Sequence, residues 1–159
     1  MHRNAELIEK FYRAFAALDA ATMASCYAED VEFQDEVFTL HGKRETVGMW
    51  SMLCSGVKEK GADVWRLEHS GIAADDKTGC AHWDAHYRFT MTGRMVLNRI
   101  DAEFEFRDGL IVRHRDRFDF WRWSRQALGA PGLLLGWTPL IRNKVQGTAR
   151  ANLQRFLAT

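Results

Sequence analysis

The chain has 159 residues, of which 47% are hydrophobic, 12% aromatic and 27% charged, and its net charge at pH 7 is only +1. This length fits one domain with a substantial hydrophobic core, and the composition is that of an ordinary soluble globular protein. No apolar run approaches the ~20 residues that a membrane span requires. The amphipathic start MHRNAELIEKFY carries two acids and resembles neither a signal nor a transit peptide.

The three cysteines, Cys26, Cys54 and Cys80, are odd in number, widely spaced and set among apolar neighbours. A disulfide framework or a zinc site needs closer or paired spacing. We therefore expect reduced, buried thiols in a cytoplasmic protein.

Charge is unevenly spread along the chain. Residues 113–159 hold nine Arg and Lys against two Asp, a balance of +7, which leaves −6 for the rest. Such asymmetry indicates either an anionic partner or basic and acidic parts that face each other within a fold or a dimer, and we prefer the second. There is no basic-aromatic ladder typical of a nucleic-acid reader, so we expect no nucleic-acid partner. Because no apolar run is long enough to span a bilayer, we expect no membrane partner either.

Helices are predicted first along the chain. Residues 4–18 place apolar side chains at helical spacing. Asp19 is a good N-cap for a short second helix that extends to Tyr27. After a strand-like run at 31–38, Gly42 opens a third helix.

The pattern then changes from helical to alternating, which predicts strands. The predicted strands are 63–72, 80–91, 94–106 and 110–121, with turn signals at Thr92-Gly93 and Arg107-Asp108-Gly109. Helices followed by an antiparallel meander are the α+β pattern, and three N-terminal helices can cover the apolar face of the sheet.

The last part of the chain departs from this pattern. We assign residues 1–123 to the α+β domain and residues 124–159 to a C-terminal helical extension that packs on it. Ser124 is a possible cap for a short helix, which Gly129-Ala130-Pro131-Gly132 interrupts, and Thr138-Pro139 supplies the N-cap and first residue of a final helix.

One carboxylate breaks the pattern of its strand. In the run 31–38, alternation places Val31, Phe33, Asp35 and Val37 on the apolar face. Burial of a lone Asp costs several kcal/mol unless it finds a partner, and it raises the pKa toward the range useful for proton transfer at neutral pH. Asp35 is therefore a candidate general base.

The last predicted strand carries a second polar group on its apolar side, where His114 and Asp116 alternate with Val112, Phe118 and Phe120. An imidazole beside a carboxylate suits general acid-base chemistry. The pair could equally satisfy each other as a buried structural network, and the sequence leaves the two readings even.

Asp101 is less clear. Even-numbered residues form the apolar face of the strand 94–106, so alternation points Asp101 to solvent unless a β-bulge shifts the phase. Metal binding is not expected, because His82 and His86 on one strand face lie ~13 Å apart.

The order of these elements resembles the nuclear transport factor 2-like superfamily, which includes SnoaL-like cyclases, ketosteroid isomerases and limonene-epoxide hydrolases. Three segments carry the resemblance: Phe11-Tyr12-Arg13-Ala14-Phe15, Cys26-Tyr27-Ala28-Glu29-Asp30-Val31, and Arg107 to Val112 followed by Arg115-Asp116-Arg117-Phe118-Asp119. The resemblance implies N-terminal helices packed on a strongly curved antiparallel or mixed sheet, cone-shaped around a central pocket. It also implies a homodimer.

The resemblance extends to single residues. Asp35 aligns without a gap on the proton-shuttling Asp of ketosteroid isomerases, whereas Phe11 takes the place of their oxyanion-stabilising Tyr and Tyr12 is one residue off. One alignment makes Asp101 the second oxyanion acid and another puts Ala102 there. Asp116 resembles an Asp of the epoxide hydrolases.

These observations predict a cofactor-free acid/base enzyme of isomerase, cyclase or hydratase/hydrolase type that acts on a small hydrophobic molecule. Asp35 would be the base, Asp116 and His114 its acid or orienting partners, and the substrate-binding candidates are Tyr12, Trp50, Asp101 and Phe118. The alternative is a non-catalytic module of the same fold that binds a ligand or forms a dimer.

Overall fold

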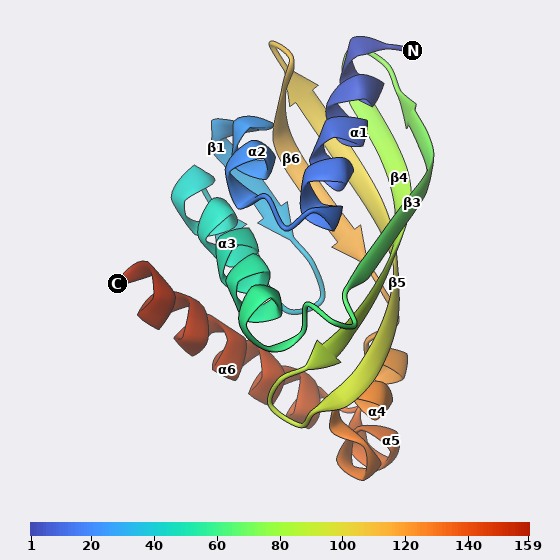
Figure 1. Ribbon diagram of the computed structural model, residues 1–159, viewed down its shortest axis with the longest axis vertical. Coiled ribbons are helices and arrows are strands. Elements are labelled where there is room, and N and C mark those ends of the chain that lie inside the picture. The colour runs from blue at the N-terminus through green and yellow to red at the C-terminus, as the bar shows by residue number, and fades with distance from the viewer.

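Three helices precede most of the sheet in the chain and cover one of its faces (Figure 1). The computed structural model describes all 159 residues, and the helices are α1 (Arg3–Ala16), α2 (Ala20–Ser25) and α3 (Lys43–Lys60). The Asp19 side chain caps α2 by accepting a hydrogen bond from the Thr22 N–H at 3.1 Å, as predicted. Gly42 precedes α3 with φ of 87°, a conformation that glycine adopts without strain.

The sheet has six strands: β1 (Tyr27–Gln34), β2 (Thr39–His41), β3 (Arg66–Ala74), β4 (Thr78–Phe89), β5 (Arg94–Arg107) and β6 (Leu110–Arg117). Their order across the sheet is β2-β1-β6-β5-β4-β3, and every neighbouring pair is antiparallel except β1 and β6, which are parallel. The predicted α+β class and mixed sheet are therefore confirmed. The parallel pair matters for the site, because it brings the ends of β1 and β6 to the same edge of the molecule.

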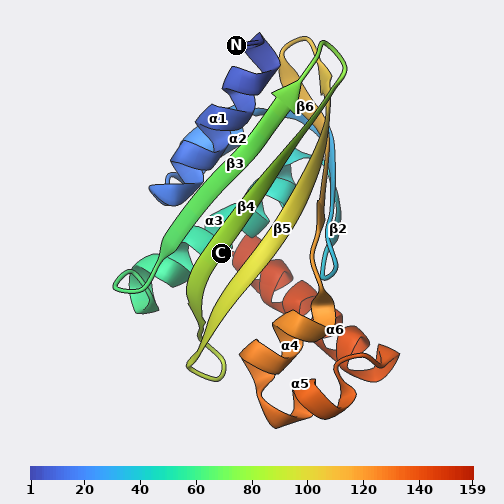
Figure 2. The same cartoon turned by 90° about the vertical axis from the view of Figure 1, so that its right-hand side faces the viewer.

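The predicted strong curvature of the sheet is wrong. Figure 2 shows long twisted strands that do not curl into a cone. The β4–β5 ladder explains this, since it runs from Thr78 opposite Glu105 to Phe89 opposite Arg94 without a shift in register. Strands bend sharply where a bulge inserts an extra residue, and this central ladder contains none.

The last strand ends earlier than predicted. It stops at Arg117, and Asp119 accepts a hydrogen bond from the Arg122 N–H at 3.0 Å, so that α4 (Phe120–Leu128) begins where the sequence predicted strand. Ser124, the predicted cap, lies instead inside α4 and donates to the Trp121 carbonyl oxygen. A local carboxylate cap thus overrides the apolar alternation that continues to residue 121.

The C-terminal segment forms two further helices, α5 (Ala130–Leu135), which was not predicted, and α6 (Pro139–Leu157), which begins at the predicted proline. The main core contains 25 buried hydrophobic residues between α1–α3 and the sheet. A smaller cluster holds α4 and α6 against β5, and its members are Val96, Phe120, Trp123, Ala127 and Ile141. None of the helices is both long enough and apolar enough to cross a lipid bilayer. Cys26 and Cys54 are buried free thiols, but Cys80 is exposed, contrary to expectation.

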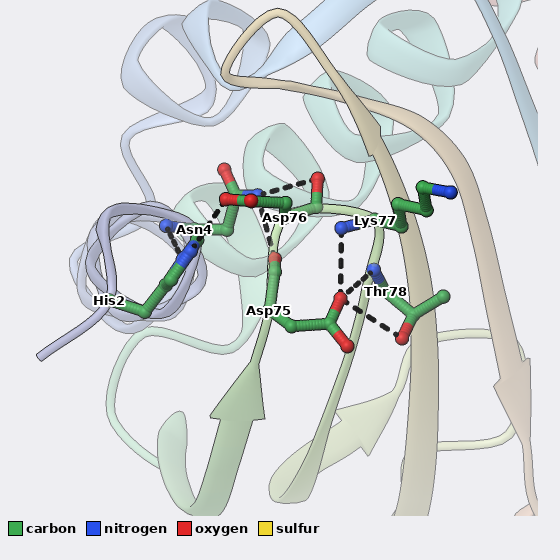
Figure 3. Close-up of polar contacts among 6 residues, drawn as sticks. All are labelled: His2, Asn4, Asp75, Asp76, Lys77 and Thr78. Atoms are coloured by element: carbon green, nitrogen blue, oxygen red, sulfur yellow. Dashed lines mark hydrogen bonds and ion pairs between the residues drawn. The ribbon is translucent and has the colours of Figure 1, made fainter.

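The N-terminus of α1 is fixed to the β3–β4 turn (Figure 3). The buried Asn4 amide donates to the carbonyl oxygens of Asp75 and Asp76 at 2.9 and 3.3 Å. The Asp75 carboxylate in turn accepts from the backbone N–H groups of Lys77 and Thr78. These contacts set the position of α1 along the sheet, and so the depth at which its aromatic residues enter the core.

Close packing of α5 on α4 depends on a glycine. A Cβ at Gly132 would overlap the backbone carbonyl of Ser124, which cannot move without distorting α4. We predict that Gly132→Ala lowers the free energy of unfolding by about 1–3 kcal/mol, as overpacking does. Gly147→Ala in α6 is the matched control, because nothing lies within 4 Å of its Cβ position and alanine favours a helix by about 1 kcal/mol. Urea unfolding of both variants measures the difference, and equal effects would contradict this account of α5.

Candidate active site

Asp35 lies in the turn between β1 and β2, one residue beyond the strand in which the sequence placed it. Its Oδ1 accepts hydrogen bonds from the backbone N–H groups of Val37 and Phe38 at 2.7 and 2.6 Å, and its own N–H donates to the Phe38 carbonyl oxygen. Asp commonly stabilises turns in this way. Both hydrogen bonds use one oxygen, so Oδ2 accepts none from the protein.

The environment of Asp35 favours its protonated form. The side chain is half-buried, and this burial raises the pKa from its ordinary value of 3.8 to about 7. The two backbone hydrogen bonds act in the opposite direction, and the negative charges of Asp116 and Glu36 add to the increase. Asp35 is therefore a carboxyl group that can gain or lose a proton near neutral pH.

A buried polar network lies on β6 beside this turn. His114 and Asp116 are 1% and 3% exposed, and His114 Nε2 is 2.9 Å from Asp116 Oδ1. The other ring nitrogen, Nδ1, is 2.7 Å from the hydroxyl oxygen of Tyr27. Trp50 Nε1 donates to that same oxygen at 2.9 Å, and Trp83 Nε1 makes a longer contact of 3.5 Å with Asp116 Oδ1. Five residues from β1, α3, β4 and β6 are thus joined in one chain of hydrogen bonds.

The donors of this network define a tautomer of His114. Trp50 N–H can only donate, so it occupies one lone pair of the Tyr27 oxygen, and the Tyr27 hydroxyl proton is free to donate to Nδ1. Nε2–H then donates to the carboxylate of Asp116. Burial, aided by the Asp116 charge, raises the Tyr27 pKa well above 10, which keeps this hydroxyl protonated. The arrangement satisfies every group with a neutral imidazole and an ionised carboxylate.

Two further tyrosines lie near the carboxylates. The Tyr12 hydroxyl is buried without a hydrogen-bond partner, and burial followed by the Asp116 charge raises the pKa of this group well above 10. The Tyr87 hydroxyl accepts from Trp123 Nε1 at 2.7 Å, and its pKa is raised to about 12 by burial, with a contribution from the Asp35 charge. Tyr12 therefore has an unpartnered hydroxyl close enough to Asp116 to feel its charge, and Tyr87 is close enough to Asp35 to feel the charge of that carboxylate.

The remaining predicted residues fall in different places. Trp50 is 3% exposed and belongs to the hydrogen-bonded network, and Phe118 is half-buried against both hydrophobic clusters. Asp101 points outward, with 80% of its side chain exposed and His82 Nδ1 2.8 Å from its Oδ1. The structure does not bring Asp101 to the face that carries Asp116, so the alignment that made it a second oxyanion acid has no geometric basis.

Sequence reasoning missed Tyr27, Trp83 and Tyr87. Tyr27 was placed in the second helix, whereas α2 ends at Ser25 and Tyr27 begins β1. Trp83 and Tyr87 do follow the alternation of β4, but only the strand order and register show that Trp83 reaches Asp116 and that Tyr87 contacts Trp123.

Two surface depressions, of about 480 and 210 Å³, border the outer side of α1. Charged residues make up half or more of the lining of each, Glu6 and Lys10 among them, and neither includes Asp35 or Asp116. The central pocket remains a prediction.

The Tyr27 hydroxyl can be tested against a matched tyrosine. We predict that Tyr27→Phe lowers the free energy of unfolding by about 2–4 kcal/mol, because it leaves the Trp50 N–H and His114 Nδ1 buried without partners. Tyr12→Phe removes a hydroxyl that has no partner, so it should be neutral or stabilising. Denaturant unfolding compares the two, and a Tyr27→Phe variant as stable as Tyr12→Phe would contradict the network described here.

Comparison with known proteins agrees with this architecture. Residues 8–114 match the family model of the SnoaL-like domain. A proposed polyketide cyclase from Silicibacter sp. TM1040 is 20% identical with a TM-score of 0.62, and the alignment covers 78% of this chain and 94% of that one. An epoxide hydrolase of Mycobacterium tuberculosis, similar to limonene-epoxide hydrolase, is 20% identical over 87% of this chain and 95% of that chain, with a TM-score of 0.61.

A Catenulispora acidiphila protein with a ketosteroid isomerase-like fold, solved with trimethylamine, is 14% identical over 84% of this chain and 98% of that chain, with a TM-score of 0.62. At these identities the similarity shows a common fold. A comparison with curated proteins gives no match.

Proposed function

Because the chain belongs to the SnoaL-like domain family, we propose that it is a cofactor-free acid/base enzyme that acts on a small hydrophobic molecule. The observation that carries this proposal is the Asp35 carboxyl group, whose pKa is raised to about 7 and whose Oδ2 has no protein partner. A general base is most effective when its pKa lies near the working pH.

The proposed roles follow from the hydrogen bonds. Asp35 Oδ2 takes a proton from a carbon atom of the substrate or from an attacking water molecule, while Oδ1 stays fixed by the turn. Asp116 holds the His114 ring in one tautomer and supplies negative charge that favours a proton on its neighbours. The unpartnered Tyr12 hydroxyl can donate to a substrate oxygen on which charge develops.

The substrate class is inferred from the apolar surroundings of these groups. Phe33 packs edge-on against the His114 ring with a centroid distance of 5.0 Å, Phe104 is tilted against it at 4.4 Å, and Trp50 stacks on it at 6.0 Å. Apolar walls with few polar groups suit a molecule of polyketide, steroid or terpenoid type. Isomerisation, cyclisation and hydration of such molecules all need one proton removed and one returned, which two carboxylates and a tyrosine can do.

One observation favours the alternative, a non-catalytic ligand-binding module. His114 and Asp116 are almost fully buried, and their mutual hydrogen bond would also be expected of a structural network. The two candidates differ in turnover, because a binding module would retain a ligand without exchanging its protons.

The test is proton exchange by the wild-type protein in deuterated buffer. A panel of a β,γ-unsaturated steroid ketone, a terpene epoxide and a polyketide β-keto ester is incubated with enzyme, and NMR follows deuterium incorporation, isomerisation and ring opening. We expect catalysed exchange or conversion of at least one compound without added metal or nucleotide. Saturable binding with no exchange in any compound would establish the binding module instead.

A further inference from the structure

Exposed apolar side chains gather at one end of the molecule. Ten large hydrophobic residues are exposed, and eight of them lie in the segment 121–140 or in and next to the β4–β5 turn, which packs on α4: Met91, Met95, Trp121, Leu133, Leu134, Leu135, Trp137 and Leu140. We call the last five the apolar tip. Their exposed fractions range from 43% for Leu135 to 73% for Trp137. Such concentration marks an interaction surface, since isolated exposed residues would be scattered.

The shape of the tip limits what can cover it. Figures 1 and 2 place α5 at the far end of the molecule, beyond the edge of the sheet. Three consecutive leucines, 133–135, occupy the last turn of α5, and successive residues of a helix point about 100° apart. A single protein groove can receive only part of such a divergent set. The acyl chains of a lipid bilayer are fluid, so they can surround all three leucine side chains.

The close packing behind the tip fixes its orientation. Gly132 lies against the backbone of Ser124, and Trp121 Nε1 donates to the Leu133 carbonyl oxygen at 3.2 Å. These contacts hold α5 on α4 by its backbone, so the leucine side chains are left outside.

The C-terminal segment that carries the tip is positively charged. Residues 120–159 contain six basic residues and no Asp or Glu: Arg122, Arg125, Arg142, Lys144, Arg150 and Arg155. Arg142 pairs with Glu36 at 2.7 Å, and the guanidinium of Arg125 lies over the Trp121 ring. Arg122 and Lys144 are exposed and have no ion-pair partner. Two tips of this charge would repel each other, whereas phosphate groups would neutralise them.

We propose that the apolar tip and its flanking cations bind the surface of a bilayer that contains anionic phospholipid. Leucine and tryptophan side chains enter the boundary between head groups and acyl chains, and Arg122 and Lys144 meet the lipid phosphates, as in other peripheral membrane proteins. This revises the expectation of no membrane partner, which rested on the absence of a spanning segment. Surface binding requires none.

The experiment is flotation of the whole protein with vesicles of phosphatidylcholine alone or with about 30% phosphatidylserine. We expect the wild-type protein to float with the anionic vesicles and to be released by high salt. Combined Leu134→Ser and Trp137→Ser should weaken binding at least about tenfold, and combined Arg122→Gln and Lys144→Gln by about tenfold or more. Both pairs of side chains are exposed, so folding should be unaffected.

Leu53→Ser is the matched control, because Leu53 is an exposed leucine of α3, far from the tip. This variant should bind vesicles like the wild type. No flotation of the wild-type protein would overturn the proposal, as would equal binding by the tip variants. Light scattering of the same proteins gives the remaining outcome: a dimer that the tip substitutions convert to a monomer, without vesicle binding, would assign the tip to a second copy of the chain and overturn the lipid proposal.

Discussion

Replacing Asp35 with Asn will lower turnover of any substrate found in the panel by about 10²–10⁴-fold, the usual contribution of a positioned general base. Asparagine keeps an oxygen for the two N–H groups of Val37 and Phe38, so the turn should persist. The loss then reports the missing base rather than a misfolded loop. Asp63→Asn is the control, because this carboxylate is exposed and paired with Arg88 on the outer surface, and it should leave turnover unchanged.

The same substitution has a signature in the pH dependence of stability. The pKa of Asp35 is higher in the folded protein, about 7, than its ordinary value of 3.8. Proton binding therefore stabilises the fold, fully so below pH 3.8, and this stabilisation is lost as the pH rises through about 7. Between pH 3.8 and about 7, the free energy of unfolding of the wild-type protein should fall by up to about 3–4 kcal/mol relative to that of Asp35→Asn, whose amide does not titrate.

Turnover should show the opposite trend, rising with pH as Asp35 becomes the charged base near pH 7. Urea unfolding and rate profiles at a series of pH values measure both effects. If stability varied with pH in the same way in the wild type and in Asp35→Asn, and the variant kept its turnover, Asp35 would only stabilise the turn and would not be the base.

Much of the fold could be predicted from periodicity and caps. The helical spacing of residues 4–18, the Asp19 cap and the Thr138-Pro139 start are local signals, and local contacts form the elements that they predict. The end of β6 could not be predicted from alternation, because Phe120 and Trp121 continue the pattern while Asp119 caps a helix. Two short elements, β2 and α5, carry too few residues for periodicity to show.

The candidate site could be predicted only in part. Alternation placed His114 and Asp116 on the buried face, and the structure agrees. It could not show that β1 pairs in parallel with β6, which places Gln34 opposite Arg115 and so brings Asp35 toward Asp116. Nor could it find Tyr27, since the hydrogen bond between Tyr27 and His114 joins residues 87 positions apart.

Removing the Asp116 side chain should have the largest effect on stability. In Asp116→Ala, the Nε2–H of His114 and the N–H of Trp83 lose their acceptor in a buried site, and a cavity remains. We predict that the free energy of unfolding falls by about 3–5 kcal/mol. Asp116→Asn retains a carbonyl oxygen that can accept from both groups, so its loss should be about 1 kcal/mol.

The conservative variant separates the structural role of Asp116 from its chemical one. Asp116→Asn removes the negative charge that helps to raise the pKa of Asp35, so the pH at which turnover rises should move to lower values. Turnover itself should fall by about 10²-fold or more if Asp116 supports proton transfer. If His114 and Asp116 have only a structural role, a different result is expected. Asp116→Ala would then be easily unfolded, while Asp116→Asn would keep the turnover and the pH profile of the wild type. Both variants are compared with the wild type in the same turnover assay. A shift of the pH profile in Asp116→Asn therefore shows that the charge of Asp116 acts on Asp35, and an unshifted profile shows that it does not.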